Sequence, residues 1–355
     1  MKTENQIVTA QILSSGKQQK LFFAALLFLV FCLLILDIFS GSVSIKASDV
    51  IKAIFTNTDS NFETIILKFR LPKAVTALTV GIALSLSGLQ MQTVFRNPMA
   101  GPDVFGISSG ASLGVAFVIL GFSAGISPES LKGFGNWILV FASWAGAGAV
   151  MILIMFISTR VKDIMTILII GIMLSSGISA IVTIMQYFSN ETMLKAYVIW
   201  TMGSLGNLTS SQLNVLLICV SVGVFLSLVS SKMMNALLLG ENYAGSIGLN
   251  VRNARIVVFV STCILAGSVT AFCGPIGFIG IAVPHVARIL FKTSDHKILI
   301  PATILTGGAV MLASDIISQL PGSESILPVN SVTSLIGVPV VIWVILRNRK
   351  YSGLF

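Results

Sequence analysis

The feature that most constrains this chain is a series of long apolar segments separated by short polar connections. Hydrophobic residues make up 55% of the 355 residues and charged residues only 10%, whereas soluble domains carry about 25% charged residues. About 20 apolar residues are enough for a helix to cross a bilayer. We therefore predict an all-α polytopic membrane protein with about ten transmembrane helices, at residues 21–39, 74–95, 105–126, 136–158, 164–188, 212–231, 254–273, 278–292, 299–320 and 327–346.

The segments indicate one transmembrane domain, residues 21–355, after a cytoplasmic N-terminal segment, residues 1–20. No polar stretch is long enough to form a second domain. The basic N-terminus followed by an apolar run resembles a signal peptide, but no clean small-residue cleavage site follows, so we interpret the run as a retained first helix. A short amphipathic piece, residues 191–205, is expected at the outer surface.

The distribution of Lys and Arg predicts the orientation. With a cytoplasmic N-terminus, fifteen of the 22 Lys and Arg residues fall in inner connections and seven in outer ones, as the positive-inside rule expects. Both termini are then cytoplasmic and the number of spans is even. The net charge of +9 therefore indicates membrane orientation and not nucleic-acid binding.

The stretch from residue 70 to 114 is interpreted as a hairpin of two tightly packed membrane helices joined by a stiff polar turn. Small residues recur on one face of each helix, which lets helix backbones approach closely. A similar spacing recurs in the seventh span in the opposite direction, which leaves an inverted repeat and a chance match equally open. The small residues are Gly81, Ser85 and Gly88, then Gly106, Gly110 and Gly114, with the recurrence at Gly267, Ala271 and Gly274.

The runs RLPK, SGLQMQ and RNPMAGPDVFGISSGA resemble the permease subunits of ABC importers for iron–siderophore complexes, haem and cobalamin. The resemblance implies a bacterial cytoplasmic membrane protein with an inverted repeat of helices 2–5 and 7–10. It also implies two ATP-binding subunits on the cytoplasmic side, an extracytoplasmic substrate-binding protein, and a second permease copy as a homodimer or heterodimer. The chain contains no GxxxxGK[ST] motif, so a partner must bind and hydrolyse ATP. We expect a non-catalytic subunit without cofactor or metal.

The cytoplasmic connection at residues 235–250 is patterned, and two short helices bent at Gly240 would offer apolar side chains to a partner. An interfacial helix resting on lipid headgroups is the alternative. The run LLLGENYAGSIGLNVRNAR resembles the coupling loop of the same family, which docks on the ATPase subunit. The residues implied for coupling are Leu239, Gly240, Glu241, Ala244, Gly248 and Leu249.

The resemblance also implies two further sites. Arg70 and Lys73 would face the binding protein, although membrane-interface snorkelling also explains them without a partner, and Gln319 stands where relatives often carry Arg. A small-residue face on the fifth span either packs on a helix or lines a cavity, and the gate would lie near Asp163–Thr166. The residues implied for path and gate are Asn97, Met99, Ile164, Met165, Gly171, Ser175 and Ser179.

The remaining polar residues give weaker indications. Asp315 lies within a span, where a carboxylate usually faces a partner or water; a structural hydrogen bond and a role in the path are both open. The four cysteines lack CxxC spacing, and His285 is expected to be packed or hydrogen-bonded.

The rival functions are an ion-gradient-driven secondary transporter and a channel or structural membrane protein. Among cargoes, a ferric siderophore is expected first, with haem or cobalamin close behind.

Overall fold

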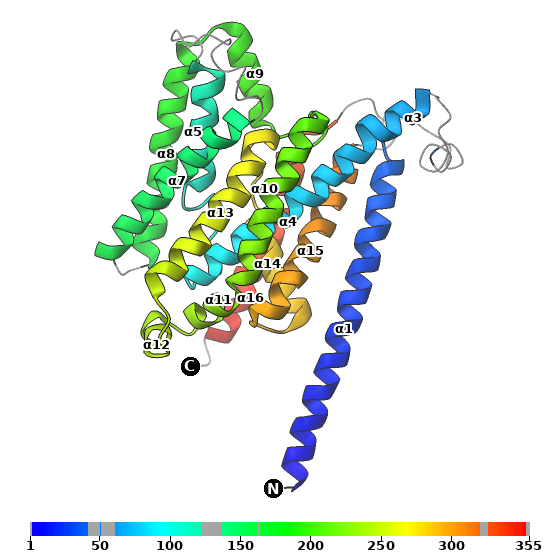
Figure 1. The fold of residues 1–355 in the computed structure, drawn as a ribbon, viewed down its shortest axis with the longest axis vertical. Coiled ribbons are helices and arrows are strands. Elements are labelled where there is room, and N and C mark those ends of the chain that lie inside the picture. Colours follow the sequence, from blue (N-terminus) through cyan, green and yellow to red (C-terminus); the bar gives the residue numbers. More distant parts are fainter. Residues whose placement is uncertain are drawn as a thin grey trace.

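The structure is a computed structural model that describes residues 2–41, Val50, 61–121, 137–161, 164–319 and 326–352. These residues form helices and their connections (Figure 1). The helices are α1 (Lys2–Phe39), α3 (Asn61–Ile65), η1 (Ile66–Arg70), α4 (Leu71–Val94), α5 (Ile107–Ile119), α7 (Trp137–Arg160), α8 (Ile164–Tyr187), α9 (Glu191–Thr201), α10 (Ser210–Val229), α11 (Ser231–Leu238), α12 (Glu241–Ser246), α13 (Val251–Cys273), α14 (Ile279–Phe291), α15 (His296–Ser318) and α16 (Val329–Ser352).

Every apolar segment of the sequence coincides with a helix. Among the described residues, 7 helices are long and apolar enough to cross a membrane, and three shorter apolar helices lie in α5, α14 and α16. Two of the short helices begin after a residue with left-handed backbone, Gly106 (φ 77°) before α5 and Phe278 (φ 67°) before α14. The total of about ten membrane crossings stays a prediction.

The second span begins earlier than its sequence predicts. Helix α3, the π-helical turn η1 and α4 follow one another without a break, so the candidate span runs over Phe62–Val94 and not from residue 74. Pro72 lies in the first turn of α4, directly after the π-helical turn, and the helix continues through it. Two of the basic residues that lowered the apolarity of this stretch, Arg70 and Lys73, have partners within the protein, as described below.

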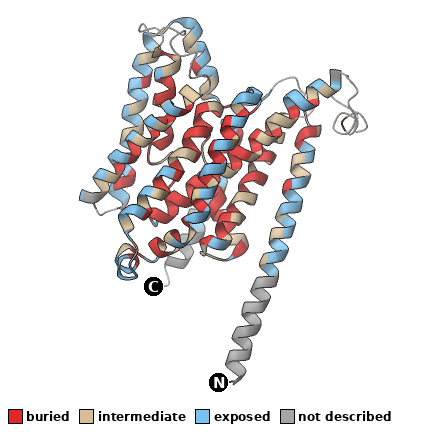
Figure 2. Ribbon diagram, in the orientation of Figure 1, coloured by how far each residue is buried: buried red, intermediate tan, exposed pale blue. Residues whose placement is uncertain are grey.

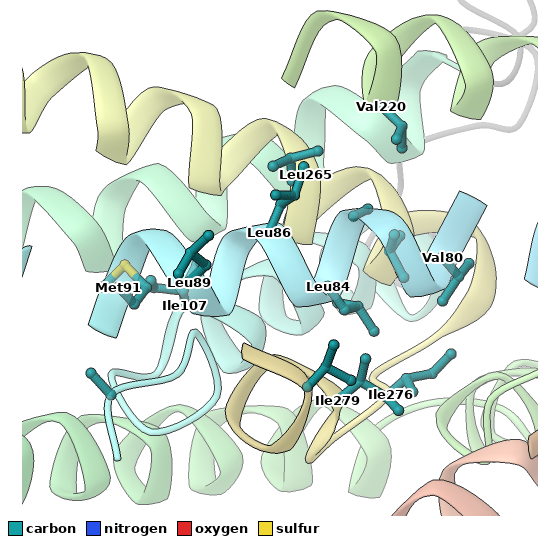
Figure 3. Packing of buried hydrophobic residues seen from close by; sticks show 14 of the residues in the cluster. Val80, Leu84, Leu86, Leu89, Met91, Ile107, Val220, Leu265, Ile276 and Ile279 are labelled. Atoms are coloured by element: carbon teal, nitrogen blue, oxygen red, sulfur yellow. The ribbon is translucent and has the colours of Figure 1, made fainter. Parts of the chain in front are cut away.

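Helix α4 is the centre of the bundle. It packs against α10, α13, α14 and α15, and 83% of the residues in its most apolar window are buried, against 28% in α8. Figure 3 shows Leu86 of α4 beside Leu265 of α13, and Leu84 facing Ile279 of α14. Buried residues concentrate in this central group of helices, whereas the helices at the edges are largely exposed (Figure 2).

The predicted tight hairpin between the second and third spans is wrong. Helices α4 and α5 hardly touch; α4 packs most extensively on α15, and α5 packs on α7. The small residues do allow close approach, but to other helices: a Cβ on Gly88 would overlap the carbonyl group of Gly280 in α14, and one on Gly114 would overlap that of Ala142 in α7. Residues 95–106 are long enough to separate the two helices, and Phe95 stacks on Phe105 within this connection with ring centroids 4.0 Å apart.

The two halves of the bundle share a local pattern. Helix α4 contacts α14 and α15, while α13 contacts α5 and α7. The sequence Gly-Pro-x-x-Phe precedes both short helices, at residues 101–105 and 274–278. These similarities agree with the inverted repeat, which itself stays a prediction.

Candidate functional site

One candidate site is the surface formed by α11 and α12. The chain bends between them at Gly240 (φ 115°, ψ 153°), a backbone conformation that favours glycine. Three apolar side chains four residues apart are exposed here: Leu239 (66%), Tyr243 (50%) and Ile247 (58%). We call these three residues the apolar ridge. Two short helices bent at Gly240 are what the sequence predicted.

The other residues implied for coupling hold this surface in place. Ala244 is fully buried, and Leu249 packs against the main core. Glu241, at the start of α12, forms an ion pair with Arg255 of α13. Gly248 (φ 85°) makes the second bend. The connection is therefore a folded element fixed to α13, and the apolar ridge lies on its exposed side.

A hydrogen-bonded chain that the sequence did not reveal connects α11 to the core. The side-chain oxygen Oδ1 of Asn235 lies 2.7 Å from Nδ1 of His296, and the side-chain amide nitrogen of Asn235 donates to Asp295 (2.7 Å). Nε2 of His296 lies 2.7 Å from the hydroxyl of Thr93 in α4. The hydrogen bond from Asn235, followed by that from the Lys297 N–H, lowers the pKa of Asp295. The surface element is thus linked by hydrogen bonds, through His296, to the central helix α4.

The turn after α4 lies beside this surface. The side chain of Asn97 accepts a hydrogen bond from the Met99 N–H (2.8 Å), and His285 bonds to the carbonyl oxygen of Pro98 (2.8 Å). Arg288 bonds to Gln92 in α4. His285 is therefore hydrogen-bonded, as predicted. A groove of about 740 Å³ separates this turn from α12, and Arg96, Glu241 and Tyr243 are among its lining residues.

The small residues on one face of α8 have two environments: two of them pack against the chain, and one lines a cavity. A Cβ on Gly171 would lie 2.7 Å from the carbonyl oxygen of Val104, and Ser175 lies against Gly106, so both pack on the connection before α5. Ser179 lines a cavity of about 670 Å³ between α5, α8, α9 and α16. Met165 is 65% exposed. The side chain of Ile164 and all of Asp163 lie outside the described residues.

The two residues expected to face a binding protein have partners within the protein. Nζ of Lys73 lies 3.1 Å from Asp315, whose side chain is completely buried. The guanidinium of Arg70, a residue only 8% exposed, donates to the carbonyl oxygens of Ile38 (3.1 Å) and Phe39 (3.0 Å) at the end of α1. Asp315 therefore has a partner within the protein, which agrees with the structural one of its two interpretations.

Gln319 joins this buried group to α1. Its amide donates to Asp37 (2.7 Å) and to Asp315 (3.2 Å). The second oxygen of Asp37 is buried and has no hydrogen-bond partner. An arginine at position 319 would bring a second positive charge here; with glutamine, Lys73 is the cation that compensates the two carboxyl groups.

Comparisons with known proteins identify the class that this fold defines, a multi-pass helical permease. The sequence matches the FecCD transport family over residues 26–347. It is 34% identical to the hemin transport system permease protein HmuU of Yersinia pestis, over 91% of this chain and 95% of that protein. It is 36% identical to the vitamin B12 import system permease protein BtuC of Klebsiella pneumoniae, over 80% and 83%.

A solved structure gives the same result. The chain superposes on an inward-facing metal-chelate type ABC transporter with a TM-score of 0.76 at 26% identity, over 92% of this chain and 99% of that one. The protein belongs to the FecCD transport family. It is therefore a non-catalytic permease component of a membrane transport system.

Proposed function

We propose that the protein is the permease subunit of a binding-protein-dependent ABC importer that translocates a metal chelate, with a ferric siderophore as the first candidate and haem or cobalamin next. The single observation that carries this function is the apolar ridge on a rigid element tied to the central helix α4. An exposed apolar surface of this kind is typical of a protein contact. In this proposal, two ATP-binding subunits dock on the ridge from the cytoplasmic side, where both termini also lie.

The proposed path runs along α8 and the turn at Asn97 and Met99. Exposed apolar side chains cover α8, including Ile169, Ile172, Met173 and Ile184, and they offer a surface for a second permease copy. The cavity beside Ser179 would then face the axis between the two copies. Alternating access arises when movement of α11 and α12 reaches α4 through Asn235 and His296.

At the opposite end, Lys73 is the better placed of the two residues proposed for binding-protein docking. It lines a pocket of about 330 Å³ together with Arg70 and Gln319, and its side chain is 17% exposed. Arg70 would act indirectly, by fixing the end of α1.

The ion-gradient alternative has less support. A secondary transporter normally has ionisable groups near the middle of the membrane that exchange ions with both sides. Asp37, Asp315 and Lys73 instead form one closed group at the outer end of α15, bonded to each other through Gln319.

Replacing Leu239 with aspartate should abolish co-purification of the ATP-binding subunit with the tagged full-length chain. A charge on the ridge cannot be buried against a partner without a large desolvation penalty. Leu239→Met, which keeps the apolar contact, should retain the ATPase at the wild-type ratio. The measurement is the stoichiometry of the purified complex and its ATP-dependent uptake of labelled chelate. Wild-type uptake by Leu239→Asp would contradict the coupling assignment.

A further inference from the structure

The cavity beside α8 has an uneven chemical composition. Seven serine and threonine side chains line it, among them Ser108, Ser112, Ser179 and Ser334. Asp103 is its one acidic lining residue, and no lysine, arginine or histidine is among the described residues that line it. The described wall of the cavity therefore offers hydroxyl groups and one carboxyl group, and no basic side chain.

The position of Asp103 follows from how the chain is built. It comes directly after Pro102 in the irregular connection before α5, and Gly171 and Ser175 of α8 allow that connection to approach closely. Burial raises the pKa of the Asp103 carboxyl group, and a hydrogen bond with Ser108 at the start of α5 opposes that rise. A carboxylate at membrane depth is costly, and such groups usually face a water-filled path or a partner.

The loop on the other side of the cavity is fixed as well. The Gly277 N–H donates to the side chain of Asn330 (3.1 Å), and both residues line the cavity. A Cβ on Gly277 would lie 3.9 Å from an Asp103 carboxylate oxygen. Asp103 thus lies between two anchored backbone segments, so its carboxyl group has a defined place on the wall.

No basic side chain from the described part of the chain lines the cavity beside Asp103. Arg70 and Lys73 line a different pocket, and Arg96 and Arg255 line the groove at the α12 surface. In a homodimer, the second copy would bring a second Asp103 to the same path. Like charges disfavour each other strongly in a partly desolvated site.

We infer that this cavity selects a neutral or cationic ferric trishydroxamate over an anionic chelate; this rests on the proposed function. Three singly charged hydroxamates neutralise Fe³⁺, and an added amine makes the complex cationic. Three doubly charged catecholates leave a negative complex, and haem carries two propionate groups. The amide groups of a trishydroxamate can also donate to and accept from the serine and threonine hydroxyls.

The test measures binding to the full-length chain in nanodiscs. Three iron-labelled probes are compared: an amine-bearing trishydroxamate, its N-acetylated neutral form, and a triscatecholate. We expect the cationic complex to bind roughly tenfold more tightly than the triscatecholate, since charges at cavity distances contribute on that scale. Asp103→Asn should remove most of the difference between the cationic and neutral forms, and Asp103→Lys should invert the order.

Glu191→Gln is the matched control, because it neutralises an exposed carboxylate at the start of α9 and should leave the order unchanged. Equal binding of all three probes, or an unaltered order in Asp103→Asn, would overturn the charge selection while leaving the importer function intact. Failure of every probe to bind, in a preparation that still co-purifies its ATPase, would overturn the assignment of this cavity as the cargo site. Failure of the proposed function itself would show separately, as loss of the ATPase partner.

Discussion

Alanine in place of Gly88 is expected to destabilise the bundle. The added methyl group would overlap the backbone of Gly280, and neither backbone can move aside as a flexible side chain could. Separating α4 from α14 would also break the hydrogen bond between Gln92 and the Ile281 carbonyl oxygen (3.1 Å). We expect a loss of about 3 kcal/mol, the upper end for overpacking, measured as a lower thermal midpoint of the full-length chain in detergent.

The matched control is Gly148→Ala in α7, a helical glycine with no neighbouring atom within 4 Å of the added Cβ. Alanine has the higher helix propensity, by up to about 1 kcal/mol, so this variant should be as stable as the wild type or slightly more stable. Equal thermal midpoints for Gly88→Ala and Gly148→Ala would show that α4 and α14 do not approach each other as closely as described.

Replacing Lys73 with methionine is expected to destabilise the protein by about 3–5 kcal/mol, the usual cost of removing one partner of a buried ion pair. The variant leaves Asp315 and Asp37 buried without their cation. The double variant Lys73→Met with Asp315→Asn should recover much of the loss, because it also removes the buried charge. Thermal midpoints of the single and double variants measure the coupling between the two residues.

Lys68→Met serves as the control, because Lys68 lies nearby in η1 and is exposed; surface substitutions usually change stability by less than about 0.5 kcal/mol. If Lys73→Met matched this control in stability and lowered only the affinity for the binding protein, Lys73 would be a docking residue and not part of the internal charge group. The two substitutions therefore distinguish the interpretations of the RLPK motif.

Much of the fold followed from local patterns. A helix in a bilayer must be long and apolar, so the positions of the membrane helices are visible in the sequence without knowledge of their neighbours. The bend at Gly240 was also predictable, because leucines before a glycine and an acidic residue after it mark the end of one helix and the start of another. The π-helical turn before Leu71 was not predicted.

Helix partners were harder to predict. Small residues on one face show that a helix packs closely, but lipid-exposed and buried apolar faces have similar compositions, so the partner of each face is not encoded locally. Gly81, Gly88 and Gly114 were recognised as packing residues and were assigned to the wrong neighbours. The partners of Lys73 and Asp315, and the chain from Asn235 through His296 to Thr93, join residues far apart in the sequence.

The sequence by itself determined an all-helical membrane chain, the bent element at Gly240 and, through its motifs, the transport family, because hydrophobic length and glycine conformation are local properties. Only the tertiary structure decided that Lys73 pairs with Asp315, that α5 packs on α7, and that Asp103 lines a cavity with Ser179. Those outcomes depend on which distant backbones come together, and that is settled by packing and by the cost of leaving a charge unpaired in an apolar interior.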